Sequence, residues 1–329
     1  MATGVVMVVM AVAMLGDLDT RFQTAVAAHL PGVLIDPTEK LERKVKHVHE
    51  PKLALAPDFT GNQRWFNTPG GRPLHMKQLR GKVVLVDFWT YTCINCIRTL
   101  PYLEALDKRY RKDGLVIVGV HTPEFPFERD AGNVQRAINQ DGIKYPVAQD
   151  NDYKTWDAYG NEYWPAEYFV DAKGHVRYTH FGEGGYQHKE QVVRALLAEA
   201  GHRPGGGMTH AHGLHVTFDA TPETYLGTER APHPPPYLSI TGWHRYPDHA
   251  EAGPGAQLRL DFAARRVYLV LGSPDRPRSL DVILDGRPYR HLLIRQQKLY
   301  NLVDLPRPGR HELVLRPEQG ISGYAFTFG

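Results

Sequence analysis

Two cysteines, Cys93 and Cys96, stand between a stretch typical of a buried strand and a stretch typical of a helix. Lys82 to Trp89 is apolar almost throughout, as in a strand at the centre of a sheet. From Ile94 to Lys112, large apolar residues recur every three or four positions, which predicts a helix with one buried face. The sequence has no other cysteine, so a disulfide-framework mini-domain and a four-cysteine zinc site are excluded. A fold for this chain must place one cysteine pair at the start of a helix.

Strand-like and helix-like segments alternate from Pro57 to about Ala200. This alternation predicts an α/β domain with a central mixed sheet flanked by helices. Asp171-Ala172-Lys173-Gly174 is a hairpin signal between two strands. The further strands are expected at Leu115–His121, Tyr145–Ala148, Glu167–Asp171 and His175–Phe181, and the further helices at Asn133–Gln140 and Gln187–Ala200.

The last third of the chain has a different character, with short strand-like runs separated by turn residues such as Asp285-Gly286 and Pro308-Gly309. That pattern is typical of an all-β sandwich or jelly roll. The runs are Leu258–Phe262, Arg266–Leu271, Leu280–Leu284, His291–Ile294, Leu299–Val303, His311–Leu315 and Tyr324–Phe328.

We therefore divide the chain into an apolar segment (1–30), a linker (31–52), an α/β domain (53–201), a linker (202–215) and a β-sandwich (216–329). The apolar run at the start is shorter than the roughly 20 residues of a membrane-spanning helix, and no basic residue opens it as in a secretory signal. Its interpretations are a signal anchor, the end of a longer membrane helix, or a buried core helix. The net charge of +3 argues against an electrostatic nucleic-acid binder.

The position of the cysteine pair at a helix start predicts redox chemistry. Unpaired N–H groups and partial positive charge at a helix N-terminus stabilise a thiolate at Cys93. Cys96 lies one turn further on, where it is more shielded and can resolve a mixed disulfide. The alternatives are half of a metal site completed by histidines and a static structural disulfide, but the strand–CxxC–helix context favours redox chemistry. We expect no cofactor besides this disulfide and no metal.

Two further positions support this interpretation. Asp87 lies in the strand six residues before Cys93, where a buried carboxyl would have a raised pKa and would exchange a proton with Cys96. Trp164-Pro165 precedes a strand, and its peptide bond is a candidate for the cis form that would present backbone groups to a partner chain. We expect a catalytic set of Cys93, Cys96, Asp87 and Pro165, and a partner groove formed by Trp89, Thr92 and Trp164.

These segments resemble known proteins. VDFWTYTCINC with Pro101 resembles the thioredoxin active-site segment, and WPAEYFVDAKG resembles the cis-proline strand of that superfamily. APDFTGNQRWFN, LRGKVVLVDFW and YPVAQDN resemble the membrane-tethered TlpA and ResA branch. HTPEFPFE, WDAYGNEYWPA and GYAFTFG are similar to the DipZ type. In that type a DsbD/CcdA-like membrane domain precedes a thioredoxin-like domain and a sandwich resembling a carbohydrate-binding module.

The resemblance implies an extracytoplasmic, membrane-anchored thiol-disulfide oxidoreductase on the outer face of a bacterial cytoplasmic membrane. It implies electrons from a DsbD/CcdA-like donor, protein disulfides as substrates and a link to cytochrome c biogenesis. The sequence departs from the relatives in three places: Thr92 stands where thioredoxin has Trp, Ile-Asn separates the cysteines, and Thr99 stands where the ResA branch has an acid. Because these groups tune the potential, thioredoxin's reducing poise does not carry over directly.

Weaker signals leave other functions open. His210, His212 and His215 form a cluster in a Gly-rich linker, which favours a solvated segment over a metal site. Glu183 lies among glycines after a strand, a position that favours a turn over an approach to the redox centre. Aromatic residues of the C-terminal domain (Tyr225, Tyr237, Trp243, Tyr246, Tyr300 and Tyr324) suggest carbohydrate binding or a β-sandwich core. The rival functions are a glycan- or cell-wall-binding protein with a redox-silent scaffold, and a thiol peroxidase, since Thr90 lies three residues before Cys93.

Overall fold

A computed structural model describes residues 54–209, 220–273 and 275–329. The segments expected at 1–30 and 31–52 lie outside the described residues, as does the end of the linker expected at 202–215. Within the described ranges, no helix has both the length and the apolar character needed to cross a membrane.

The first domain is built on a six-stranded sheet with the order β1-β4-β3-β2-β5-β6. Strand β2 pairs parallel with β3 and antiparallel with β5, so the sheet is mixed, as the sequence predicted. The strands are β1 (Arg64–Phe66), β2 (Val83–Trp89), β3 (Leu115–His121), β4 (Val147–Gln149), β5 (Ala166–Val170) and β6 (Val176–Phe181).

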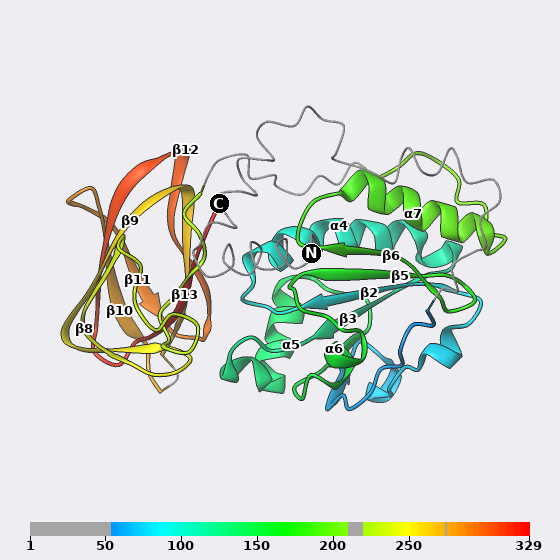
Figure 1. Ribbon diagram of the computed structural model, residues 1–329, viewed down its shortest axis with the longest axis horizontal. Coiled ribbons are helices and arrows are strands. Elements are labelled where there is room, and N and C mark those ends of the chain that lie inside the picture. Colours follow the sequence, from blue (N-terminus) through cyan, green and yellow to red (C-terminus); the bar gives the residue numbers. More distant parts are fainter. Residues whose placement is uncertain (1–53, 210–219, 274) are drawn as a thin grey trace, which may run out of the picture. The chain divides into compact units, whose positions relative to one another are not determined.

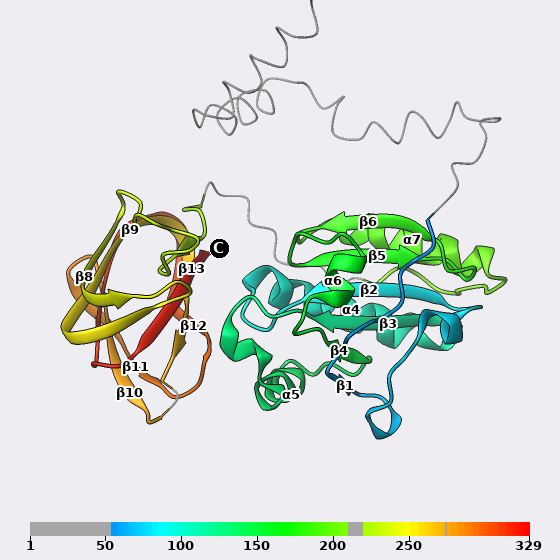
Figure 2. The same ribbon diagram turned by 60° about the horizontal axis from the view of Figure 1, so that its bottom comes forward.

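The helices of this domain lie on the two faces of the sheet (Figures 1 and 2). They are α4 (Ile94–Tyr110), α5 (Ala131–Gln140), α6 (Lys154–Ala158) and α7 (Tyr186–Glu199), with 3-10 turns at Pro69–Gly71, Met76–Leu79, Arg111–Asp113 and Pro126–Arg129. One core cluster joins α4, α5 and α7 to the sheet, and a second cluster joins α6 to the opposite face. The three longer helices were predicted within a few residues of these bounds.

Alternation along β2 decides which way Asp87 points. Leu85 and Trp89 belong to the core beneath α4, whereas Val86 and Phe88 belong to the core on the opposite face. Side chains of a strand alternate between the two faces of its sheet. Asp87 therefore faces the layer that contains α4 and its cysteines.

The C-terminal domain is all β, as predicted. Its sheet has the order β11-β10-β12-β9-β13-β7, and β8 also pairs with β9. The strands are β7 (Thr224–Tyr225), β8 (Leu238–Arg245), β9 (Ala250–Gly272), β10 (Arg278–Leu284), β11 (Arg287–Ile294), β12 (Lys298–Pro317) and β13 (Ser322–Phe328). Among the described residues, an apolar cluster drawn mostly from these strands forms the core of the domain.

Several expected strands of this domain are parts of longer ones. The two runs at 258–262 and 266–271 are continuous in β9, and those at 299–303 and 311–315 are continuous in β12. The turn expected at Pro308-Gly309 is wrong, because a register shift between Asp304 and Gly309 accommodates these residues inside β12. The turn at Asp285-Gly286 is confirmed, with both residues at positive φ (50° and 73°) between β10 and β11.

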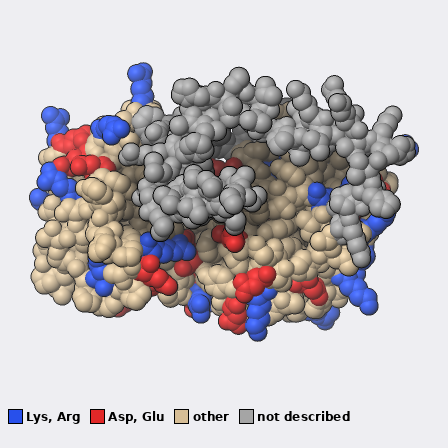
Figure 3. Space-filling view, viewed as in Figure 1, with Lys and Arg blue, Asp and Glu red and all other residues tan. Residues whose placement is uncertain are grey.

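Basic and acidic side chains are interspersed on the face shown in Figure 3. This distribution agrees with the nearly balanced totals of 39 basic and 36 acidic residues. No strongly basic surface of the kind that binds nucleic acid is seen in that view among the described residues.

Candidate active site

Cys93 and Cys96 lie at the junction of β2 and α4. Cys93 is the N-cap of α4, and its Sγ accepts a hydrogen bond from the backbone N–H of Cys96 at 3.2 Å. Both cysteines are free; Cys93 is partly exposed, whereas Cys96 is buried. The N–H donor and the helix N-terminus both favour negative charge on Cys93 Sγ. This arrangement allows Cys93 to meet a visiting sulfur while Cys96 stays shielded behind it.

The buried Cys96 requires a nearby base to lose its proton. Burial, followed by its hydrogen bond and charge interaction with Cys93, raises the pKa of Cys96 well above its usual range. Cys96 is therefore a thiol at neutral pH and becomes an attacking thiolate only if a nearby group takes its proton.

Asp87 is the acid that lies within electrostatic reach of Cys96. Its side chain is buried, and among the described residues neither carboxyl oxygen has a hydrogen-bond partner. Burial, and then the carboxylate of Glu167, raise the pKa of Asp87 well above its usual range, while Lys189 lowers it. A carboxyl with free oxygens and a raised pKa can act as the proton acceptor and donor that Cys96 requires.

The peptide bond between Trp164 and Pro165 is cis, as the sequence suggested. Gly182 N donates to the Pro165 carbonyl at 2.8 Å, so this carbonyl is occupied within the domain. The partly exposed Trp164 ring packs on Trp156, with ring centroids 4.3 Å apart, and its Nε1 donates to the Thr122 carbonyl at 3.1 Å. Trp164 is thus held firmly beside Pro165.

The predicted partner groove needs correction at two positions. Trp89 is 0% exposed and Thr92 is 1% exposed, so burial argues against either side chain lining a surface groove. The exposed rings next to Pro165 are instead Tyr163 and Phe181, which are about half exposed and have centroids 5.1 Å apart. Phe181 comes to this place because it pairs with Ala166 across the β5–β6 register.

Thr92 is buried because it contacts an acid that sequence reasoning missed. Its hydroxyl donates to Glu128 Oε1 at 2.6 Å, and the N–H groups of Glu124 and Phe125 donate to Glu128 Oε2 at 2.6 and 2.9 Å. Burial raises the pKa of Glu128 to about 7, although these hydrogen bonds oppose the shift. Glu128 therefore anchors the residue that directly precedes the exposed cysteine.

We expect Glu128→Gln to change how stability depends on pH. The pKa of Glu128 rises from 4.5 to about 7 on folding, so the folded state binds more protons than the unfolded state between these values, and wild-type stability falls as pH rises through that window. Relative to wild type, the Gln variant should gain about 3 kcal/mol in unfolding free energy between about pH 4 and about pH 8.

Denaturant unfolding at a series of pH values measures this difference. The exposed Glu162, changed to Gln, is the matched control and should follow the wild-type curve. A Glu128→Gln curve parallel to wild type across the whole range would show that Glu128 does not titrate in this window.

Thr90 and His121 lie beneath the cysteine motif. Both are fully buried, and Thr90 Oγ1 lies 3.4 Å from His121 Nε2. Burial lowers the pKa of His121 to about 3, so the ring is neutral. Because the Thr90 hydroxyl contacts this ring in the core, it is poorly placed to bind a peroxide beside Cys93, which argues against the peroxidase alternative.

Glu183 is both a turn residue and a neighbour of the active-site helix. Gly182 and Gly184 on either side of it have positive φ values of 82° and 99°, which fits a turn. Its carboxylate lies 3.4 Å from Nη1 of the buried Arg98, two residues after Cys96. The turn expectation therefore holds, and the fold also brings Glu183 to the first turns of α4.

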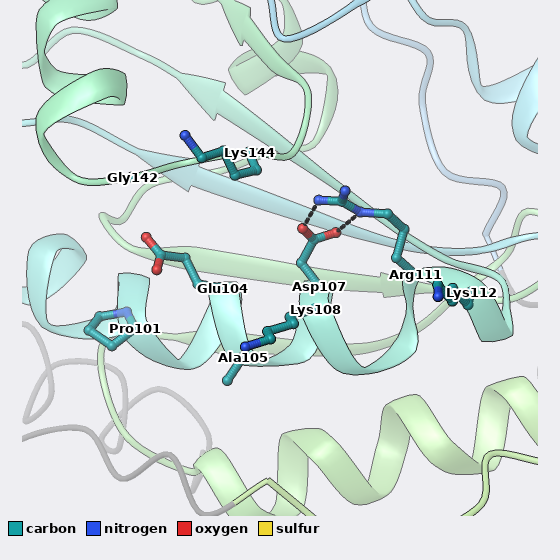
Figure 4. Close-up of a pocket in the computed structure, with 9 residues that line it drawn as sticks. All are labelled: Pro101, Glu104, Ala105, Asp107, Lys108, Arg111, Lys112, Gly142 and Lys144. Atoms are coloured by element: carbon teal, nitrogen blue, oxygen red, sulfur yellow. Dashed lines mark hydrogen bonds and ion pairs between the residues drawn. The ribbon is translucent and has the colours of Figure 1, made fainter.

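A surface pocket lies along α4 and the 3-10 turn that follows it, from Pro101 to Lys112 (Figure 4). Charges of both signs line it, including the ion pair between Asp107 and Arg111. Neither cysteine lines this pocket, so it is separate from the redox pair. The histidine cluster at His210, His212 and His215 lies outside the described residues; elsewhere, within the described ranges, no group of His, Cys, Asp and Glu has a metal-binding arrangement.

Comparison with known proteins gives matches in both domains. Residues 54–179 match the AhpC/TSA family, and residues 237–329 match a family described as a thioredoxin-like C-terminal domain. Protein DipZ of Mycobacterium tuberculosis is 34% identical over all of this chain and 53% of DipZ, so the chain spans about half of that relative. Thiol-disulfide oxidoreductase YkuV of Bacillus subtilis is 31% identical over 44% of this chain and 94% of YkuV. A solution structure of an oxidised thioredoxin-like protein is 32% identical, covering 45% of this chain and 97% of its own, with a TM-score of 0.40.

Proposed function

We propose that this chain, which belongs to the thioredoxin-like thiol-disulfide oxidoreductases, exchanges electrons with the cysteine pairs of other proteins through Cys93 and Cys96. The observation that carries the proposal is the partly exposed Cys93 capping α4, with the buried Cys96 one turn behind it. In the proposed cycle Cys93 is the nucleophile, Cys96 is the resolving thiol and Asp87 moves the proton.

We further propose that the chain works outside the cytoplasm, anchored at a bacterial cytoplasmic membrane, with electrons supplied by a DsbD/CcdA-like membrane partner. The support is the match to DipZ along the whole chain and the apolar character of Met1 to Leu15. Reductant from such a donor would pass to protein disulfides, including those met during cytochrome c biogenesis.

The direction of electron flow is tested by the reduction potential of the Cys93–Cys96 couple, equilibrated against glutathione or dithiothreitol buffers. As a reductase, the protein should have a potential nearer to thioredoxin's, about −270 mV, than to DsbA's, about −120 mV. A potential near that of DsbA would overturn the reductase direction while leaving the thiol chemistry intact.

The exposed rings beside Pro165 make a separate prediction. If Tyr163 and Phe181 contact the polypeptide substrate, their double replacement by Ala should raise KM for a protein disulfide about thirtyfold, since burying each ring contributes about 1 kcal/mol and the two together about 2 kcal/mol. The reaction with a small disulfide such as oxidised glutathione should change little. Steady-state kinetics with insulin and with oxidised glutathione measure the two reactions separately. An equal loss of activity with both substrates would show that the rings do not act by contacting the polypeptide substrate.

Carbohydrate binding by the C-terminal domain is a second proposal with narrower support. Tyr237, Trp243 and Tyr300 pack against the core of this domain, as the alternative interpretation of its aromatic residues had it. The exposed ring is Tyr246, which stacks on His249 with centroids 4.7 Å apart. A glycan array with the full chain and with its Tyr246→Ala variant tests this proposal. Sugar binding that is lost in the variant would support a carbohydrate ligand, and an absence of sugar binding by the full chain would contradict the proposal.

A further inference from the structure

Three ionisable side chains are buried together behind the active-site cysteines. Asp87 in β2 and Glu167 in β5 are directly opposite each other in the antiparallel register, and Lys189 comes from α7. Their exposed fractions are 1%, 0% and 0%. Directly opposite residues on neighbouring strands have Cβ atoms about 5 Å apart and share one face of the sheet. The two carboxyls therefore lie close together in a medium with little water.

Lys189 supplies one positive charge to these two acids. Its Nζ lies 2.6 Å from Glu167 Oε2, and it also lies over the rings of Tyr102 and Tyr186, 5.0 and 4.7 Å from their centroids. Lysine is almost never fully buried without a partner. One ammonium neutralises one carboxylate, so the second carboxyl either keeps a proton or carries an uncompensated charge. The ion pair assigns the ammonium to Glu167 and leaves Asp87 as the carboxyl that exchanges a proton.

We propose that Glu167 and Lys189 are positioning residues that act through Asp87, and that their opposite charges set the pH at which Asp87 takes the proton of Cys96. This inference rests on the proposed function, because it concerns the resolving step of the same cysteine pair. Neither residue touches the reacting sulfurs.

The chemical step is the resolution of the mixed disulfide. The Cys96 proton passes to the Asp87 carboxylate, and the resulting thiolate attacks Cys93 Sγ. The Cys93–Cys96 bond forms as the bond between Cys93 and the substrate sulfur breaks, and the electron pair leaves with the substrate thiolate. The substrate pair is reduced by two electrons, and the enzyme pair is oxidised by two. Asp87 must be ionised to accept the proton, so its proton affinity sets the pH of the step.

Glu167 and Lys189 have opposite effects on the ionisation of Asp87, and little else among the described residues shields its carboxyl from their charges. The neighbouring position in β3 is Gly119, which has no side chain to shield Asp87. Negative charge on Glu167 opposes ionisation of Asp87, and positive charge on Lys189 favours it. The titratable groups around the pair are Cys96 from α4, Tyr145 from the segment before β4, Glu167 from β5 and Lys189 from α7, with Tyr102, His180 and Tyr186 around the lysine.

The test uses the full chain carrying Cys93→Ser, in which Cys96 is the remaining cysteine. Thiolate absorbance at 240 nm, corrected with the variant lacking both cysteines, gives the pH midpoint of Cys96 without any redox turnover. Lys189→Met should leave Asp87 protonated over more of the titrated pH range, whereas Glu167→Gln should leave it ionised over more of that range. The two variants should therefore displace the pH midpoint of Cys96 in opposite directions. With pH-rate profiles of insulin reduction in the two-cysteine chain, Lys189→Met should move the rise in rate upward by about one pH unit, and Glu167→Gln should move it downward.

Controls separate this role from a structural one. Lys189→Arg keeps the charge and should keep the wild-type midpoint, and the exposed Lys108→Met on α4 should have no effect. Circular dichroism establishes folding, and if Lys189→Met does not fold, Glu167→Gln and Lys189→Arg carry the test. Shifts of Lys189→Met and Glu167→Gln in the same direction, or none where Asp87→Asn does shift the midpoint, would overturn the proposal. If the wild-type chain does not reduce insulin at all, the proposed function fails. The absorbance titration still tests the roles of Glu167 and Lys189 in that case, because it does not depend on turnover.

Discussion

Replacing Cys93 by Ala should reduce the rate of insulin disulfide reduction to the uncatalysed level. Cys93 carries the partly exposed sulfur that can attack a substrate, and Cys96 behind it is buried. The N–H of Cys96 that supports negative charge at this position would then have no sulfur to stabilise. The measurement is the turbidity of reduced insulin with dithiothreitol as electron source.

The control for this loss is a change on the same helix outside the cysteine motif. Lys108 is exposed on α4, and Lys108→Ala should keep wild-type turnover. Circular dichroism of Cys93→Ala should match wild type, because the substitution removes one partly exposed sulfur. Full turnover by a correctly folded Cys93→Ala variant is incompatible with the proposed role of this cysteine.

Asp87→Asn should slow the resolving step by about a hundredfold near neutral pH, a typical effect of losing a general base. The amide occupies the same space but accepts no proton, and Cys96 has a raised pKa because it is buried. The defect should shrink as pH rises, since hydroxide in solution then removes the Cys96 proton. The first step, attack by Cys93, should be nearly unchanged.

Rapid-mixing experiments measure the two steps separately. Alkylation of Cys93 by iodoacetamide reports its reactivity, and the release of a chromogenic thiol from a preformed mixed disulfide reports resolution. The pKa of Asp87 is raised in the folded protein, so wild-type stability falls as pH rises above the unfolded value of the carboxyl, and the Asn variant should lose less stability on that side. An equal slowing of both steps at every pH would show that Asp87 does not serve as the base of Cys96.

The part of the fold that follows from local pattern was predictable. The unbroken apolar run before Cys93 and the spacing of apolar residues after Cys96 indicate a strand and a helix, and both are present as β2 and α4. In the C-terminal domain the breaks between strands were harder to place. Pro306 and Pro308 look like turn residues, yet β12 continues past them through a register shift that depends on pairing with β9.

The candidate site was predictable where a residue stands out from its own segment. A single acid stands in the apolar run of β2 at Asp87, and the same signal is present at Glu167 in β5. Glu128 and Lys189 carry no such mark, since acids and lysines are common in turns and amphipathic helices. They become candidates only when tertiary packing buries them against Thr92 and Glu167. Conversely, Trp89 and Thr92 adjoin the cysteine motif in sequence, but strand alternation and the contact with Glu128 bury them.

The central claim is that the Cys93 sulfur forms the mixed disulfide with another protein and that the buried Cys96 then resolves it. Its most direct test is to mix the full chain carrying Cys96→Ser with a protein disulfide and to map the product by mass spectrometry. We predict a stable mixed disulfide on Cys93, and none when Cys93→Ser with intact Cys96 is used instead. A covalent complex that forms through Cys96, or no complex with either variant although the wild-type chain reduces the same substrate, would contradict the account.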